Sequence, residues 1–155
     1  MSVAFRRDSD EEHLEPRFEL PIPPGPNYVT PAGLQAIAAR VAEIEAAILS
    51  QTDEEQSKPL KRDLRYWRHR QSSAQLAPTP RPGIVGIGSR VRFQLRGSEQ
   101  AITITGFDEA DPGQGRVAFS APLARALLGA QVGDLVDFAG EEEAIAVLEV
   151  TAPAD

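Results

Sequence analysis

Apolar side chains recur at spacings of three and four residues in two stretches of the first half of the chain. In the first stretch these positions are Leu34, Ile37, Val41, Ile44 and Ile48. In the second they are Leu60, Leu64, Trp67, Gln71 and Ala74, of which Gln71 is the polar member. This rhythm places side chains on one stripe of an α-helix and is typical of a coiled-coil seam. The pattern therefore predicts two helices that pack through these stripes.

The start of the first helix carries a clear signal. Thr30 can cap free backbone amides, and Pro31 suits the first helical position, where its missing N–H is no loss. We therefore expect a helix over residues 31 to about 50, roughly 30 Å long at 1.5 Å per residue.

A polar stretch separates the two apolar stripes. Residues 51–58 break the helical rhythm, and Pro59 is placed to start the second helix after Ser57 or Lys58. A connection this short makes neighbouring helices run antiparallel. Residues 28–77 are therefore predicted to form an antiparallel coiled-coil hairpin.

After residue 77 the pattern changes from helical to alternating. Three prolines at alternate positions forbid a continued helix, so residues 78–85 are interpreted as a Pro-rich linker. Alternating apolar and polar residues then predict strands over Ser89 to Leu95 and Gln100 to Thr105. The four residues 96–99 are expected to join these strands as a hairpin turn.

The last third of the chain continues this sheet around one short helix. Val117 and Phe119 alternate with smaller residues, as in a strand, and a helix of about two turns is expected from Pro122 to Gly129. A final strand is expected after a solvated turn of three glutamates, residues 141–143. Because no helical crossover requires a parallel pair, residues 86–152 are predicted to form a small antiparallel β domain with one short helix, which gives an α+β fold.

Composition narrows the remaining possibilities. The chain has no cysteine, which excludes disulfides, thiolate metal sites and cysteine nucleophiles. No stretch approaches the roughly 20 apolar residues that cross a bilayer, and the first ten residues lack a secretory signal, so we expect a cytoplasmic protein without membrane contact. Residues 1–27 hold an acidic cluster and a proline cluster with few large apolar side chains, and are expected to form a disordered Pro-rich tail.

Charge is distributed unevenly along the chain. The net charge is −7, which argues against general affinity for nucleic acid. Residues 58–82, however, contain seven basic side chains and one acidic side chain. A basic second helix is therefore expected between acidic flanks.

A family resemblance rests on several runs in the second half of the chain. These are Gly88-Ser89-Arg90-Val91, Asp108-Glu109-Ala110-Asp111, Ser120-Ala121-Pro122-Leu123-Ala124-Arg125-Ala126-Leu127-Leu128-Gly129 and Val132-Gly133-Asp134. In this order they resemble the C-terminal domain of the GreA/GreB family of bacterial transcription elongation factors. The resemblance implies an FK506-binding-protein-like fold for this domain and RNA polymerase as the partner. It also implies that the protein is no enzyme on its own, with no cofactor and no metal of its own.

The resemblance extends to the plan of the N-terminal half. Family members insert an antiparallel coiled coil into the secondary channel of the polymerase and present acidic residues at its tip, but their hairpins are distinctly longer. At the predicted turn this chain has Asp53, Glu54 and Glu55. Three carboxylates at a projecting point are candidates to assist the catalytic Mg²⁺ of the polymerase, since hard cations take oxygen ligands. Polar residues also fill turns simply because turns face water.

The resemblance further implies a polymerase contact in the loop before the short helix. The matching positions are Ser120, Ala121 and Pro122, with Arg125 one turn later. Family members usually have Asp or Asn, then Ser, then Pro, so this chain departs at its first two positions. The same loop also serves to start a helix.

Basic residues Arg62, Arg65 and Arg68 form a candidate patch on the second helix. Cations interleaved with aromatic residues suit nucleic acid, and the family's basic patch lies near the RNA 3′ end, so nascent RNA is expected to be contacted only indirectly. Alternatively, these cations cover a solvated helix face while Trp67 packs in the seam.

Three functional readings follow. The first is a polymerase-binding elongation factor at the secondary channel, expected to be monomeric, with stimulation of transcript cleavage left open. The second resembles the regulator of nucleoside diphosphate kinase, a relative with a short coiled coil that binds polymerase without evident cleavage activity. The third, a peptidyl-prolyl isomerase, rests only on the implied fold. A deep aromatic-lined pocket would be needed for it, and this domain has four phenylalanines without Trp or Tyr.

Overall fold

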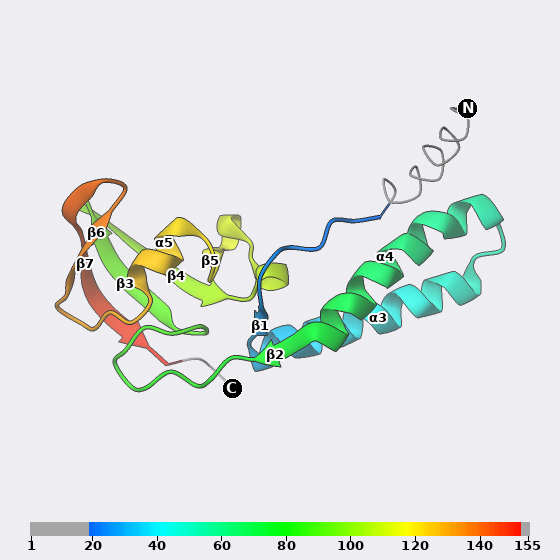
Figure 1. The fold of residues 1–155 in the computed structure, drawn as a ribbon, viewed down its shortest axis with the longest axis horizontal. Helices are drawn as coiled ribbons and strands as arrows, with labels where there is room; N and C mark the ends of the chain where they lie inside the picture. The colour runs from blue at the N-terminus through cyan, green and yellow to red at the C-terminus, as the bar shows by residue number, and fades with distance from the viewer. Residues whose placement is uncertain (1–18, 153–155) are drawn as a thin grey trace, which may run out of the picture. The chain divides into compact units, whose positions relative to one another are not determined.

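The computed structural model describes residues 19–152 (Figure 1). They divide into two compact units, one of residues 19–25 and 37–73 and the other of residues 26–36 and 74–152. The expected disordered tail falls largely on residues 1–18, outside the described part of the chain. Residues 19–26 contain no helix or strand.

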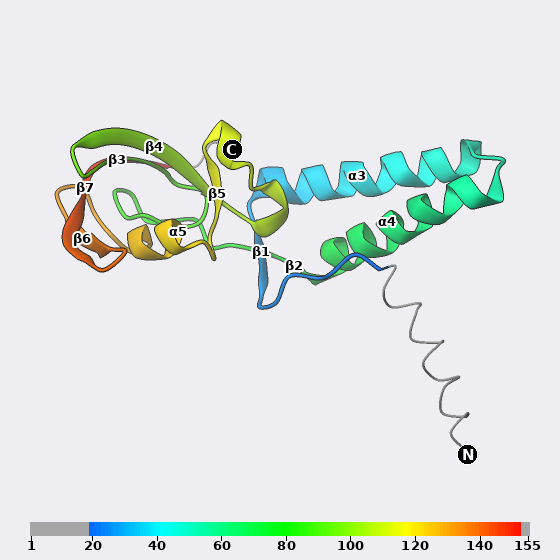
Figure 2. The same cartoon turned by 90° about the horizontal axis from the view of Figure 1, so that it is seen from above.

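Two helices of 20 residues each, α3 (Pro31–Ser50) and α4 (Glu54–Ser73), form a hairpin; α4 and α3 from residue 37 onward make up most of the first unit, and the first turns of α3 belong to the second. Figures 1 and 2 show them side by side and antiparallel, which confirms the predicted hairpin. The start and end of α3 lie where the sequence predicted. The middle of its apolar stripe is buried, with Ile37, Val41 and Ile44 each 7% exposed or less. Burial of each such side chain contributes about 1.5–3 kcal/mol.

Helix α4 begins earlier than predicted. It starts at Glu54, so the loop is only Gln51–Asp53, and Pro59 lies inside the helix instead of at its start. The reason is a cap: the Oδ1 atom of Asp53 accepts a hydrogen bond from the amide of Glu55 at 2.9 Å, which satisfies one of the free amides of the first turn. Pro59 removes one intrahelical hydrogen bond within α4.

The seam of α4 also departs from a strict heptad. Leu60, Leu64 and Trp67 are half-buried, but Gln71, the next position on this face, is exposed, and the neighbouring Arg70 is 2% exposed. Burying an amide side chain without a hydrogen bond is costly, which accounts for the exposure of Gln71. The prediction that Gln71 continues the stripe is wrong.

Two short strands flank the hairpin in sequence. β1 (Asn27–Val29) pairs in parallel with β2 (Ala74–Leu76), with Tyr28 opposite Gln75. Helix α4 therefore ends at Ser73, and the hairpin does not stay helical to residue 77. The three residues of β2 replace the expected last helical turn. Val29 is 2% exposed, so β1 is anchored by burial as well as by pairing.

The second unit contains a five-stranded sheet in the order β5-β4-β3-β7-β6. Its strands are β3 (Arg90–Leu95), β4 (Ser98–Thr105), β5 (Arg116–Ala118), β6 (Leu135–Phe138) and β7 (Glu141–Thr151). All neighbours are antiparallel except β4 and β5. The connection between β4 and β5 contains two 3₁₀ turns, η1 (Phe107–Glu109) and η2 (Pro112–Gln114). This connection is long enough for β5 to run parallel to β4. The α+β class is confirmed, but the sheet is mixed.

The turns of this sheet are tighter than the sequence suggested. Leu95 pairs with Ser98, which leaves Arg96 and Gly97 as a two-residue turn with φ values of 50° and 83°. Positive φ at both positions is the conformation that matches the twist of a hairpin. The second tight turn is formed by residues 139 and 140, so the three glutamates 141–143 begin strand β7 instead of forming a turn.

Helix α5 (Pro122–Leu127) covers the core of this sheet. Its Ala124 and Leu127 are fully buried with Phe93 and Ile145 of the sheet. The end of the predicted linker belongs to the same core, because Val85 is 3% exposed and its amide donates to the Ala130 carbonyl at 2.9 Å. The position of the short helix is as predicted.

Candidate functional site

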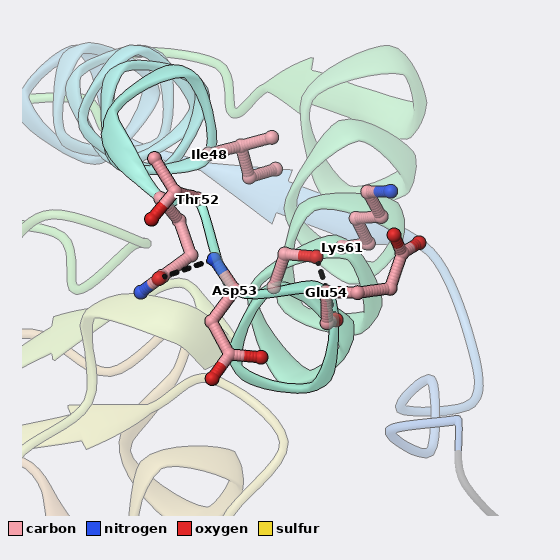
Figure 3. A pocket seen from close by; sticks show the side chains of 7 residues that line it. Ile48, Thr52, Asp53, Glu54 and Lys61 are labelled. Atoms are coloured by element: carbon pink, nitrogen blue, oxygen red, sulfur yellow. Dashed lines mark hydrogen bonds between the residues drawn. The ribbon is translucent and has the colours of Figure 1, made fainter.

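The tip of the helical hairpin forms a shallow, mainly polar hollow. Figure 3 shows the loop between α3 and α4 with the side chains that line it, Ile48, Gln51, Thr52, Asp53, Glu54, Ser57 and Lys61. The loop is held by the Gln51 side chain, whose Oε1 atom accepts from the Asp53 amide at 3.0 Å. The structure thus brings the three predicted tip carboxylates together at one end of the hairpin.

Those three carboxylates have different surroundings. Asp53 caps α4 through one carboxylate oxygen, as described above. Glu55 forms an exposed ion pair of 3.0 Å with Lys58. The side chain of Glu54 makes no hydrogen bond or ion pair with another described residue, and it is exposed. Glu54 is therefore the tip carboxylate most available to a partner.

Across residues 19–152, no three or more His, Asp or Glu side chains are grouped so that they could hold a metal ion.

The loop before α5 presents the second predicted site. Ser120, Pro122 and Arg125 are exposed, and Ala121 is half-buried at the N-cap position of the helix. Because alanine has no side-chain acceptor, it caps no amide. The structure brings all four predicted residues together at the start of α5, and their role as a contact stays a prediction.

The predicted basic patch lies along α4, at spacings of three residues that place its members on one side of the helix. Each arginine has a carboxylate neighbour. Arg62 pairs with Asp63 at 3.2 Å, Arg68 pairs with Glu45 of α3 at 2.6 Å, and Arg65 pairs with Glu19. The patch is therefore less positive than the sequence alone indicates.

A further group, which sequence reasoning left without a role, joins the start of α3 to the 3₁₀ turn η1. Glu109 accepts hydrogen bonds from the Thr30 hydroxyl at 2.7 Å, the Thr30 amide at 3.3 Å and the Gly106 amide at 3.1 Å. The sequence signal was present in the Asp108–Asp111 run, but nothing in it named Thr30 as the partner. We call this group, Thr30, Gly33, Gly106 and Glu109, the latch.

Two glycines leave the space that the contacts of the latch need. A Cβ atom on Gly33 would lie 2.1 Å from Oε2 of Glu109, and one on Gly106 would lie 2.5 Å from the Tyr28 carbonyl oxygen. Both distances are shorter than real Cβ contacts, so glycine is required for this approach.

None of the helices within residues 19–152 combines the length and apolar character that crossing a bilayer demands.

The second unit is similar in sequence to known proteins. The family described as "Transcription elongation factor, GreA/GreB, C-term" matches residues 80–152. Among curated proteins, the transcription elongation factor GreA of Bacillus anthracis is 44% identical over 55 residues, which cover 34% of this chain and 35% of that protein. GreA of Bacillus licheniformis is 46% identical over the same length and coverage. The chain spans about a third of the length of these curated relatives.

The chain also matches two solved structures. The GreA factor homolog Gfh1 of Thermus thermophilus is 15% identical, covering 81% of this chain and 99% of that one, with a TM-score of 0.39. The elongation factor GreA/GreB of Nitrosomonas europaea is 19% identical, covering 83% of this chain and 99% of that one, with a TM-score of 0.40.

Proposed function

We propose that this chain, which belongs to the GreA/GreB family through residues 80–152, binds bacterial RNA polymerase at the secondary channel as a transcription elongation factor. The match of the second unit to the family's C-terminal domain carries this proposal. The protein would act on the polymerase in the cytoplasm as a monomer. It would be no enzyme on its own and would hold no cofactor, since any catalytic Mg²⁺ would belong to the polymerase.

The loop Ser120–Pro122 and Arg125 would make the contact with the polymerase. Its exposure supports this role, because three of the four side chains are free to meet a partner surface. Ala121 and Ser120 differ from the usual residues of the family, so the contact would have fewer polar groups than in typical members.

Two modes of action remain for the hairpin tip. In the first, the tip reaches the polymerase active site and stimulates cleavage of backtracked transcripts through its carboxylates. In the second, the protein occupies the channel entrance as a regulator without cleavage activity. The commitment of Asp53 to a helix cap and of Glu55 to Lys58 favours the second mode, because only Glu54 is left unengaged.

Capture of core RNA polymerase by the full chain tests the proposed binding. We expect the wild type to retain polymerase and Arg125→Glu to retain less, because the charge reversal lies beside the contact loop. Arg81→Glu is the matched control, since Arg81 is also exposed and lies in the linker. Absence of binding by the wild type would overturn the proposal, and equal loss in both variants would place the contact elsewhere.

A transcript-cleavage assay on stalled complexes separates the two modes. Cleavage that is stimulated by the wild type and lost when residues 53–55 are all alanine would support the first mode. Polymerase binding without stimulation would support the second.

A further inference from the structure

Strands β4 and β5 end together at one end of the sheet in the second unit. They run in parallel, and Thr105 at the end of β4 lies opposite Ala118 at the end of β5. The two chains stay together one residue further, because the amide of Phe119 donates to the Thr105 carbonyl at 2.9 Å. The residues that follow the two strands therefore lie at the same end of the sheet. These are Phe107, which begins η1, and Ser120, which begins the candidate contact loop.

Strand β1 brings another aromatic ring to this end of the sheet. The rings of Tyr28 and Phe119 meet edge to face, with their centroids 5.5 Å apart. The turn η1 lies against both β1 and β5. A Cβ atom on Gly106, the residue before η1, would lie only 2.5 Å from the Tyr28 carbonyl oxygen. Tyr28, Phe107 and Phe119 thus come from three neighbouring segments beside the contact loop, and we call them the aromatic cluster.

Phe107 is the exposed member of the aromatic cluster. Its exposed fraction is 46%, and no other aromatic side chain within residues 19–152 is exposed. Tyr28 and Phe119 are half-buried. Single apolar side chains scattered over a surface need no partner, but aromatic residues are enriched at protein interfaces, where they lose their contact with water. An exposed ring that continues from two others into a contact loop therefore indicates an interaction surface.

We propose that the aromatic cluster extends the loop Ser120–Pro122 into one docking surface for RNA polymerase, and that Phe107 is its anchor, covered by an apolar patch of the polymerase. Continuity with the loop selects this partner, because Phe119 directly precedes Ser120. The inference rests on the proposed polymerase binding and adds a side chain outside the loop to it. An apolar anchor would also supply affinity that the loop, with Ala121 at its centre, does not provide through polar groups.

Titration of core RNA polymerase with the full chain tests the anchor. We expect Phe107→Ser to weaken binding about three- to tenfold, because the polymerase would cover the half of the ring that is exposed in the free protein. Leu135→Ser is the matched control. Leu135 is 55% exposed in the same unit, but it lies on β6, at the edge of the sheet opposite β5, and its substitution should leave affinity unchanged. Equal weakening by both variants, or by neither, would overturn the proposal.

A photocrosslinker separates contact from stability, because Phe107 also begins η1 and its loss affects the fold locally. p-Benzoylphenylalanine at position 107 keeps an aromatic side chain there and should crosslink to the polymerase on irradiation. The same group at position 135 should not. Absence of a crosslink from position 107 in a formed complex would overturn the proposal. A crosslink without weaker binding by Phe107→Ser would show proximity alone and would overturn the role of anchor.

These experiments distinguish failure of the anchor from failure of the proposed function. If the wild type binds polymerase and Arg125→Glu weakens binding while Phe107→Ser does not, the anchor is wrong and the proposed function stands. If the wild type does not bind, the proposed function is wrong, and the anchor is overturned with it.

Discussion

The hydroxyl of Thr30 makes two hydrogen bonds, one to a residue three positions away and one to a residue 79 positions away. It accepts from the Gly33 amide at 3.0 Å and donates to Oε1 of Glu109 at 2.7 Å. The N-cap of α3 is thus itself held by a carboxylate from the 3₁₀ turn η1, which lies in the same unit as Thr30. Because a hydrogen bond to a charged group contributes about 1.5–3 kcal/mol, this relationship is a substantial part of what fixes the start of α3.

Removing the latch carboxylate should lower stability. We expect Glu109→Ala to reduce the free energy of unfolding by about 1.5–3 kcal/mol, because the Thr30 and Gly106 amides lose a charged acceptor. Urea unfolding monitored by circular dichroism measures the change. Glu142→Ala removes an exposed glutamate as a control and should change stability by less than about 0.5 kcal/mol.

The pair itself can be isolated by a double-mutant cycle. Thr30→Val keeps the shape and removes the hydroxyl, so its cost should be smaller in the Glu109→Ala background than in the wild type. Strictly additive effects would show that the two residues are not coupled.

The effect of Gly33→Ala on stability should depend on whether Glu109 is present. Alanine favours a helix over glycine by about 0.8–1 kcal/mol, but here its Cβ would displace the Glu109 carboxylate. We expect Gly33→Ala to be neutral or destabilising in the wild type and stabilising in the Glu109→Ala variant. Thermal unfolding of the four proteins checks this, and stabilisation in both backgrounds would contradict the close approach of Gly33 to Glu109.

The three tip carboxylates should separate into structural and functional roles. Asp53→Ala should lower stability by about 1 kcal/mol because it removes the cap of α4. Glu54→Ala should leave stability unchanged and remove any cleavage stimulation that the wild type shows with polymerase. Glu55→Ala should have a small effect on both. Unfolding measurements paired with the cleavage assay distinguish these results, and cleavage that persists without Glu54 but fails without Glu55 would reverse the assignment.

Ala121 offers a substitution that restores a family residue. Ala121→Ser should add a cap to α5, worth about 1 kcal/mol, and tighten polymerase binding, the latter more strongly when Ser120→Asp is added. Ala121→Gly is the matched control, since glycine is nearly as good an N-cap but has no hydroxyl. Titration with core polymerase should show a gain for serine and none for glycine. An equal gain for both would trace the effect to the helix start and not to the contact.

Local patterns were sufficient for most of the elements. The stripe from Leu34 to Ile48 predicted α3 with its bounds, and the alternation around Val91 and Ile104 predicted β3 and β4. These predictions succeed because the spacing of inward-facing side chains is determined by the geometry of a single helix or strand. The tip was placed by the polar break between the two apolar stripes, whereas the candidate contact loop rested on the family resemblance.

Features that depend on distant partners were not predictable in the same way. The parallel pairing of β4 with β5 depends on how far two 3₁₀ turns carry the chain, and the strands β1 and β2 are only three residues long. Pro59 was interpreted as a helix start because the competing cap at Asp53 was not recognised. The partners of Glu19 and Glu109 lie 46 and 79 residues away, where no periodic pattern reaches.

Because β1 and β2 pair with each other at the base of the helical hairpin, the length of the two helices can change without changing these strands. The chain leaves β1 for α3 and re-enters at β2 after α4, so both ends of the hairpin are tied to neighbouring strands. Whole heptads could be added to both helices without changing Asn27 to Val29 or Ala74 to Leu76, because the added turns pack only against each other. The length of the arms can therefore be changed by engineering while the folded base stays the same.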